Sequence, residues 1–325
     1  MDDDDATIRL RPPAARPAAP PPPLSRRRLL GLWIGLGVAL VGLGTGTAVW
    51  WWKRAAAPAP LAEAPPVRPI APPPPPPEGP PSLNLAEIVT HRAGTSTALR
   101  WSVNPLVWVL DFPSLELQGQ GMNRAAALLE KARTPRDRVL NDVELAAAIA
   151  ADRRTASTWY FGHNYRASEL ARMFEFAARD GVQLNPQELW VQEQVELARR
   201  VDRSRDAAIL TVPALGPQVD GNLRMSILMH ELGHGQFYTL PFFAAHVMRV
   251  WDTGFSQSER AAVRSFLAAE GYDTAQEEVM ANEGMAYLLY TPDRRFFDPA
   301  RDLGWSDAQA ERLRGLLRAG APEEP

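Results

Sequence analysis

Residues 223–237 read LRMSILMHELGHGQF, an apolar run without proline that predicts a helix, expected over residues 222–238. The run contains the string His-Glu-Leu-Gly-His at positions 230–234. Residues four positions apart lie on one face of a helix, so the imidazoles of His230 and His234 can converge on one Zn²⁺ ion. Glu231 can reach a water molecule at that ion and take its proton. The run therefore predicts a helix that carries a site for metal-assisted hydrolysis.

A catalytic zinc site of this kind needs a third protein ligand and one open position. The chain has no cysteine, so the third ligand must be an oxygen or an imidazole nitrogen. Phe237 and Leu240 stand where the metzincin pattern requires Gly and His, which excludes that pattern. Glu278 and Glu283 remain as candidates, on a helix expected over residues 275–290. They lie about 140° apart around that helix, so both cannot face the ion.

The sequence around these two glutamates resembles two groups of zinc peptidases. Asn282-Glu283-Gly284-Met285-Ala286 resembles the Asn-Glu-Gly-Phe-Ala string of zinc aminopeptidases, whose Glu is the third ligand. The five residues 278–282, EVMAN, resemble the Glu-x-x-Ala-Asp string of membrane-bound zinc endopeptidases, whose first Glu is the ligand. Both groups are gluzincins, so the chain resembles a gluzincin-type HExxH zinc metallopeptidase. The resemblance implies His230, His234 and Glu283 as zinc ligands and Glu231 as general base, with Glu278 as the alternative third ligand.

Further site residues are expected in an aromatic cluster. Residues 159–165 read WYFGHNY and place a histidine and two tyrosines in a turn-like segment. A developing oxyanion needs a donor opposite the metal, and His163, Tyr165 and Tyr287 are the candidates for that role. The alternative is an aromatic core with a satisfied histidine. Of the other histidines, His246 is expected to be structural and His91 to lie on the surface.

The rest of the folded part is expected to be predominantly α, of the α+β class, a helical zincin-like metallopeptidase domain with a small sheet. Residues 98–112 predict one or two strands and residues 207–213 a short strand. Capping boxes are expected at Asn141/Glu144, Thr274/Glu277 and Ser306/Gln309. Besides the two helices already named, helices are expected over residues 122–132, 142–151, 168–179, 187–201, 257–270 and 307–319.

The N-terminal 82 residues predict a membrane-targeting segment followed by a linker to the folded part. Residues 1–28 are rich in proline and charge and are expected to be a disordered cytoplasmic tail. Residues 29–52 are uncharged and would make about 36 Å of helix, enough to cross a bilayer. Residues 53–82 form a Pro/Ala-rich linker. The flanking positive charges place the N-terminus in the cytoplasm, so the single-pass chain is expected in a bacterial inner membrane, with residues 83–325 in the periplasm or outside the cell.

Two features of this segment leave alternatives open. Residues 25–30, SRRRLL, resemble a twin-arginine export signal, and residues 55–57 could then be a cleavage site. Both interpretations place residues 83–325 in the same compartment. These residues are expected to comprise an N-terminal part, 83–205, and an HExxH-bearing part, 206–325. The glycine pairs Gly31/Gly35 and Gly42/Gly46 match the GxxxG spacing, which allows weak self-association.

Charge narrows the classes of partner. The chain has a formal net charge of −3, and residues 83–325 carry 26 Lys/Arg against 32 Asp/Glu. This acidic balance argues against a nucleic-acid partner, because phosphate contacts need clustered positive charge. The expected substrate is a peptide or an envelope protein. The alternatives are an envelope binding or scaffold module that retains the metal site, and a metal-dependent hydrolase of cell-wall material.

Overall fold

The computed structural model describes residues 79–323. The expected cytoplasmic tail (1–28), membrane helix (29–52) and glycine pairs, and nearly all of the linker (53–82), lie outside the described residues. Among the helices within residues 79–323, none combines the length and the apolar character needed to span a bilayer.

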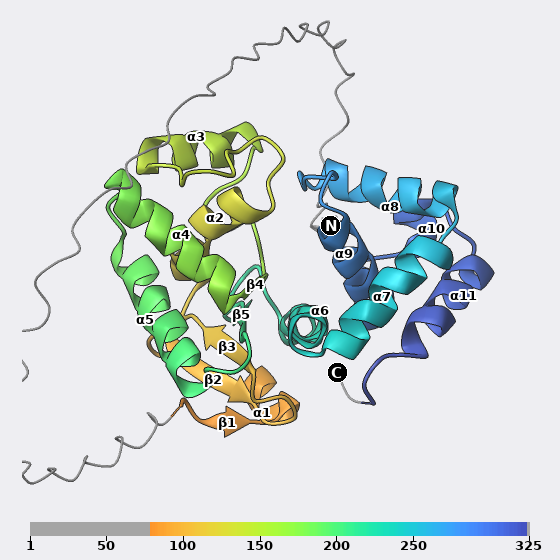
Figure 1. The fold of residues 1–325 in the computed structure, drawn as a ribbon, viewed down its shortest axis with the longest axis horizontal. Coiled ribbons are helices and arrows are strands. Elements are labelled where there is room, and N and C mark those ends of the chain that lie inside the picture. The colour runs from red at the N-terminus through yellow and green to blue at the C-terminus, as the bar shows by residue number, and fades with distance from the viewer. Residues whose placement is uncertain (1–78, 324–325) are drawn as a thin grey trace, which may run out of the picture. The chain divides into compact units, whose positions relative to one another are not determined.

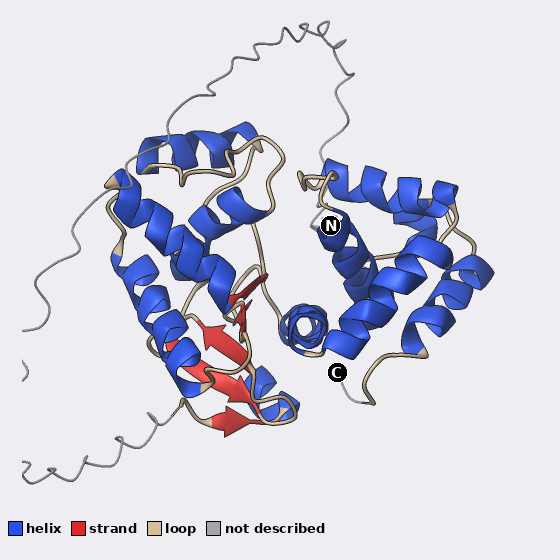
Figure 2. Ribbon diagram, in the orientation of Figure 1, coloured by secondary structure: helices blue, strands red, loops and turns tan. Residues whose placement is uncertain are grey.

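A small mixed sheet of five strands takes four of them from the N-terminal half of the described chain (Figures 1 and 2). Its strands lie in the order β1-β2-β3-β5-β4, with β1 parallel to β2, β3 parallel to β5, and the other pairs antiparallel. The two central strands read VWVLD and AILTV and are buried at every position, as expected of strands covered on both faces. The strands are β1 (Ser82–Leu83), β2 (Thr97–Trp101), β3 (Val107–Asp111), β4 (His163–Arg166) and β5 (Ala208–Val212).

Helices cover both faces of this sheet. One face, with Trp108, Leu110 and Ile209, belongs to the same hydrophobic cluster as α2 (Leu115–Leu129), α4 (Ala167–Asp180) and α5 (Pro186–Val201). The other face, with Val109 and Leu210, shares a cluster with α1 (Leu85–Thr90) and α6 (Gly221–Thr239). Helix α3 (Asp142–Ala151) contacts α2. The sheet is therefore the middle layer of three.

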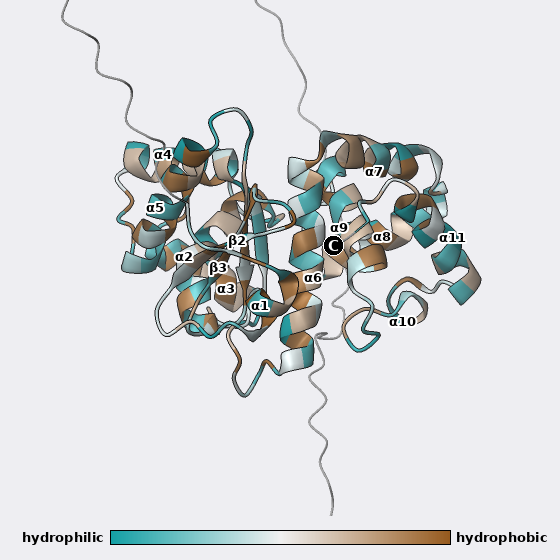
Figure 3. Ribbon diagram, turned by 90° about the horizontal axis from the view of Figure 1, so that it is seen from below, coloured by the Kyte–Doolittle hydropathy of each residue, from teal (hydrophilic) through white to brown (hydrophobic). Residues whose placement is uncertain are grey.

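The C-terminal helices form a second core. It joins side chains of α7 (Pro241–Thr253), α8 (Gln257–Ala269), α9 (Glu277–Tyr290) and α11 (Asp307–Arg318), and α10 (Pro299–Leu303) packs beside α8. Brown hydrophobic and teal hydrophilic segments alternate along these helices, as amphipathic helices require (Figure 3). Helix α6 packs on β5 and on α9, and Figure 1 shows it end-on between the sheet and the C-terminal helices. The motif helix is thus held by both halves.

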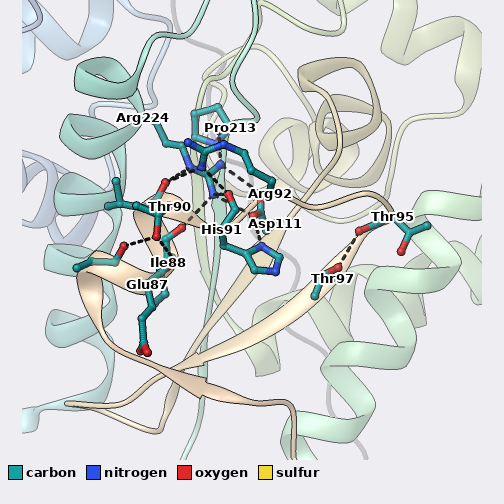
Figure 4. A network of polar contacts seen from close by, with 12 residues as sticks. Glu87, Ile88, Thr90, His91, Arg92, Thr95, Thr97, Asp111, Pro213 and Arg224 are labelled. Atoms are coloured by element: carbon teal, nitrogen blue, oxygen red, sulfur yellow. Dashed lines mark hydrogen bonds and ion pairs between the residues drawn. The ribbon is translucent and has the colours of Figure 1, made fainter.

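A buried arginine fixes the start of α6 on the sheet (Figure 4). The Arg224 guanidinium lies 3.2 and 2.9 Å from the two carboxylate oxygens of Asp111, at the end of β3. It also donates to four backbone carbonyls, those of Ile88, Val89, His91 and Pro213. Every donor of this buried cation is directed at an acceptor, so burial leaves no uncompensated charge.

His91 belongs to the same network, which corrects the expectation of a surface residue. Its Nδ1 atom lies 2.7 Å from Asp111 Oδ2, and its side chain is 27% exposed. Position alone, near the start of the folded part, did not reveal a partner that comes from β3.

The predicted class, mostly helical with a small sheet, is confirmed, and most predicted elements end within two residues of the observed ones. The interval 98–112 divides into β2 and β3 around Asn104-Pro105. The helix predicted over 122–132 starts earlier, at Leu115, because Ser114 caps it. The sequence did not predict its first turns, because Gly119 and Gly121 have low helix propensity. The segment around His163, expected to be turn-like, contains strand β4.

Two predicted capping boxes are wrong in detail. Helix α9 starts after Gln276, not Thr274, and the Glu277 carboxylate instead accepts hydrogen bonds from Trp251 and Arg264. Ser306 does cap α11, but the side chain of Gln309 donates to Glu259 and does not return to the cap. The box at Asn141 and Glu144 is confirmed in both directions.

Candidate metal centre

Three potential ligands converge where α6 meets α9. The Nε2 atoms of His230 and His234 lie 3.1 Å apart. Glu283, from the middle of α9, places one carboxylate oxygen 3.6 Å from Nε2 of His230 and the other 3.7 Å from Nε2 of His234. Within the described part of the chain these three residues form the one group with metal-binding geometry.

The distances between these atoms fit a tetrahedral zinc ion. With bonds of 2.0–2.2 Å at tetrahedral angles, ligand atoms lie about 3.3 Å apart. The separation of the two imidazole nitrogens is close to this value, and the two Glu283 oxygens, each measured to a different imidazole nitrogen, lie about 0.3–0.4 Å beyond it. In addition, Oε2 of Glu283 is buried and has no hydrogen-bond partner among the described residues. A buried carboxylate oxygen without a donor is unfavourable, unless a cation neutralises it.

Thr291 fixes the orientation of His230. The Nδ1 atom of His230 lies 2.9 Å from the Thr291 hydroxyl, which itself donates to the carbonyl of Ala286 at 3.2 Å. The hydroxyl therefore accepts from Nδ1–H, so the lone pair of His230 is on Nε2, facing His234 and Glu283. A second hydrogen bond of this kind is the usual support of a metal-binding histidine.

The protonation states of His234 and Glu283 suit a metal site, whereas the raised pKa of His230 means that this residue would lose a proton on binding a metal ion. Burial lowers the pKa of His234 to about 4, so its imidazole is neutral near pH 7. Burial alone would lower the pKa of His230, but the nearby carboxylates of Glu283 and Glu231 raise it. Burial opposes ionisation of Glu283, yet the two histidines and Tyr272 lower its pKa overall. A neutral imidazole and an ionised carboxylate are the forms that bind metal.

The Glu231 carboxylate contacts the edge strand β4. It accepts a hydrogen bond of 2.9 Å from the side-chain amide of Asn164. Burial raises the pKa of Glu231 to about 7, against the opposing effects of His230 and Asn164. Gly162 lies directly against it, since a Cβ atom there would come within 2.1 Å of Glu231 Oε1. Strand β4 and the glycine that precedes it therefore bring a hydrogen-bond donor and a position without a side chain to the buried carboxylate.

A further hydrogen bond fixes the orientation of the Asn164 side chain. The Tyr238 hydroxyl donates to Asn164 Oδ1 at 2.9 Å, which directs the amide nitrogen at Glu231. The guanidinium of Arg166 lies 4.4 Å from the centre of the Tyr238 ring, close enough for a cation–π interaction. Asn164, Tyr238 and Arg166 form a chain of contacts that orients the Glu231 carboxylate.

Glu278, the alternative third ligand, lies elsewhere. It belongs to the first turn of α9, its side chain is 53% exposed, and it forms an ion pair of 2.6 Å with Arg166. The five-residue interval from Glu283 turns the two side chains to different sides of the helix. Of the two candidates, the structure brings Glu283 to the histidines.

The three expected oxyanion donors have different surroundings. Tyr287 is the one that touches a candidate ligand, with its ring 4.8 Å from the ring of His230. His163 is buried on β4 beside the Thr211 hydroxyl, and burial lowers its pKa to about 3. Tyr165 is buried in the cluster on the α2 face of the sheet. His246, expected to be structural, donates from Nε2 to the carbonyl of Leu316 at 2.8 Å.

Sequence reasoning missed the supporting residues. No motif marks Thr291, Asn164, Gly162 or Tyr238. Thr291, Asn164 and Gly162 lie outside helix α6, whose side chains they contact. The sequence offers a signal for Gly162 and Asn164 alone, because they flank His163 in the aromatic cluster at residues 159–165.

Comparison of the chain with models of known protein families, with curated proteins and with solved structures gives no match. The arrangement of the site is therefore the basis for any function.

Proposed function

We propose that the chain is a zinc-dependent metallopeptidase of gluzincin type that hydrolyses peptide bonds. The observation that carries this proposal is the convergence of His230, His234 and Glu283 within 3.1–3.7 Å, with the separate carboxylate of Glu231 one residue away. Three protein ligands leave a fourth tetrahedral position open, as a catalytic site requires.

The chain's own residues have distinct roles in this proposal. His230, His234 and Glu283 would hold the ion, which when bound supplies a Lewis acid for the scissile carbonyl and lowers the pKa of water. Glu231 accepts the proton that the attacking water loses and passes it to the leaving amine as the C–N bond breaks. A pKa of about 7 suits a group that must both take and give a proton near neutral pH. Tyr287, beside His230, is the best placed of the three expected oxyanion donors.

The compartment is part of the proposal. Residues 29–52 would hold the chain in a bacterial inner membrane, with the metal site on the periplasmic side and peptides or envelope proteins as substrates.

Metal removal tests the proposal. The full chain would be purified in detergent, stripped of metal with a chelator, and incubated with an unfolded protein such as casein before and after zinc is restored. We expect new peptides in the mass spectrum with zinc and almost none without it. A chain that binds one zinc ion per molecule and cleaves no peptide bond would contradict the proposal and favour a binding or scaffold role.

A further inference from the structure

The four residues of the candidate site are nearly closed to solvent. The side chains of His234 and Glu283 are 0% and 4% exposed, and Glu231 is buried. The side chain of His230 is 14% exposed. A substrate carbonyl has to reach the fourth position at the ion, and the ion itself has to enter and leave. Some part of the surrounding chain must therefore move.

Residues 270–276, between α8 and α9, reach the third candidate ligand and are called the strap from here on. The side chain of Tyr272 hydrogen-bonds the Glu283 carboxylate, whose pKa it helps to lower. The ring of Tyr272 also lies 6.4 Å from that of Tyr160, in the segment that leads into β4. The strap therefore connects the candidate metal centre with the sheet half of the molecule.

A short antiparallel pairing fastens the strap to the end of α2. The amide of Asp273 donates to the carbonyl of Glu130 at 2.8 Å. The amide of Ala132 donates to the carbonyl of Gly271 at 3.1 Å. Two backbone hydrogen bonds are far fewer than a sheet strand makes, so this pairing can open while the sheet stays intact.

The side chains that hold the strap in place make single or partly exposed contacts. Gln276 donates from its side-chain amide to the carbonyl of Leu129 at 3.1 Å. Asp273 forms an ion pair of 3.2 Å with Arg136, and the two side chains are 29% and 35% exposed. Ion pairs with this much access to water contribute little to stability. The side chains therefore add only modest resistance to opening.

Both ends of the strap are suited to act as hinges. Gly271 has a φ of +90°, a conformation that glycine adopts without strain. Beside it, the carbonyl of Glu270 accepts from the Lys131 ammonium at 3.1 Å. At the other end, α9 starts after Gln276 without a side-chain N-cap. The first turn of α9 can therefore unwind without the loss of a capping hydrogen bond.

The elements around the strap are held more firmly. Strand β4 is paired with β5, the start of α6 is tied to the sheet by Arg224, and α9 packs in the second core. Of the strap residues, Tyr272 is the one that packs against a hydrophobic cluster. The strap is thus the segment beside the candidate ligands that has the least to lose when it moves.

We propose that the strap closes over the metal centre and lifts off the end of α2 to admit the substrate and the metal ion. This proposal rests on the metal centre of the proposed function. It does not depend on turnover, because metal exchange needs access to the site as much as hydrolysis does.

Hydrogen exchange on the zinc-free full chain tests whether the strap opens on its own. We expect the amides of Asp273 and Ala132 to exchange at least about tenfold faster than those of β5, because local opening needs no unfolding of the sheet. Gln276→Ala should accelerate this exchange by about three- to tenfold, since it removes one hydrogen bond of the closed form. Gln120→Ala, which removes an exposed contact with Glu116 on α2, is the matched control and should change nothing.

A disulfide that locks the strap tests whether its opening controls access. Lys131 and Tyr272 are opposite each other between the two backbone hydrogen bonds, a non-hydrogen-bonded pair with Cα atoms about 4.5 Å apart, within the range for a disulfide. The chain has no cysteine of its own, so Lys131→Cys with Tyr272→Cys can form only this bridge within one molecule. The control is Lys131→Ser with Tyr272→Ser, which cannot cross-link. We expect a chelator to remove zinc at least about tenfold more slowly from the oxidised cysteine pair than from the serine pair.

Exchange of the strap amides at the rate of the β5 amides would overturn the proposal. So would equal rates of zinc loss from the locked and the serine variants. If the double variants do not fold, the exchange rates of the wild type and of Gln276→Ala decide alone. Failure of the proposed function is distinct, because it appears as a chain without hydrolysis or without bound zinc, whereas hydrogen exchange of the strap requires neither.

Discussion

The side-chain amide of Asn164, on edge strand β4, donates to the carboxylate of Glu231, on helix α6, at 2.9 Å. The amide thereby stabilises the ionised form of a buried acid whose pKa burial has raised to about 7. A residue of the sheet thus adjusts the acidity of a residue of the motif helix.

Replacing Asn164 should move the pH dependence of hydrolysis. The Asn164→Ala change removes a contact that lowers the pKa of Glu231, so that pKa should rise. A general base must be deprotonated, so the acid limb of the kcat/KM profile should move upwards by about 0.5–1 pH unit. Tyr238→Phe, which only loosens Asn164, should shift it less. An unchanged acid limb in Asn164→Ala would show that this hydrogen bond does not affect the pH dependence of hydrolysis.

Replacing Glu231 should separate metal binding from hydrolysis. Glu231→Gln keeps the shape of the side chain and leaves His230, His234 and Glu283 intact. We expect zinc content to stay near one ion per chain while kcat falls by about 10²–10⁴-fold, the usual contribution of a general base. Metal analysis and peptide-release kinetics on the same sample check this. Full activity in the variant would point to a function that needs no proton transfer by Glu231.

A methyl group at Gly162 should displace the Glu231 carboxylate without removing it. The Cβ atom of Gly162→Ala would come within 2.1 Å of Glu231 Oε1, so the carboxylate must shift. Misplacement by about 1 Å can reduce rate by about 10²-fold, and we expect a fall of about 10- to 100-fold. Gly216→Ala is the control, because a Cβ atom there meets nothing within 4 Å. Equal activity of both variants would show that the carboxylate's position is not critical.

The two glutamates of α9 should differ in their effect on metal affinity. Glu283→Gln removes a ligand charge, and we expect zinc affinity to fall by about a hundredfold or more. Glu278→Gln, on the same helix, loses an exposed pair with Arg166 and should change affinity less than about twofold. Competition titrations with a chromogenic chelator measure both. The reverse order would assign the third ligand to Glu278.

Two glycines near the site should respond to alanine in opposite ways. A Cβ atom at Gly284 meets its nearest neighbours at 3.6 Å, which is ordinary contact, so Gly284→Ala should stabilise α9 by about 0.5–1 kcal/mol. At Gly233 it would come within 2.4 Å of the Tyr290 ring, so Gly233→Ala should destabilise the protein by about 1–3 kcal/mol. Free energies of unfolding from urea denaturation decide the signs. Destabilisation by both would mean that the space beside Gly284 is not usable.

The local features of the chain were predictable and the long-range ones were not. The motif helix, expected over 222–238, spans Gly221–Thr239, because an apolar run with a clear N-cap determines its own limits. The convergence of His230 and His234 also follows from helix geometry alone.

Glu283 could not be separated from Glu278 by the residues themselves, since the choice depends on how α9 is rotated against α6. Strand β4 was missed because its residues, HNYR, have weak strand character, and pairing with β5 makes it a strand. Thr291 comes close to His230 through a contact between segments that are distant in the sequence. Such contacts leave no pattern in the sequence.

Strand β5 comes from the C-terminal part of the chain, yet it lies between β3 and β4 of the N-terminal part. A cut at residue 206 would remove this inner strand from one fragment and leave the other fragment with a strand that has no neighbour on either edge. Neither fragment would therefore fold independently, and a gene fusion or a truncation must keep residues 82–318 together.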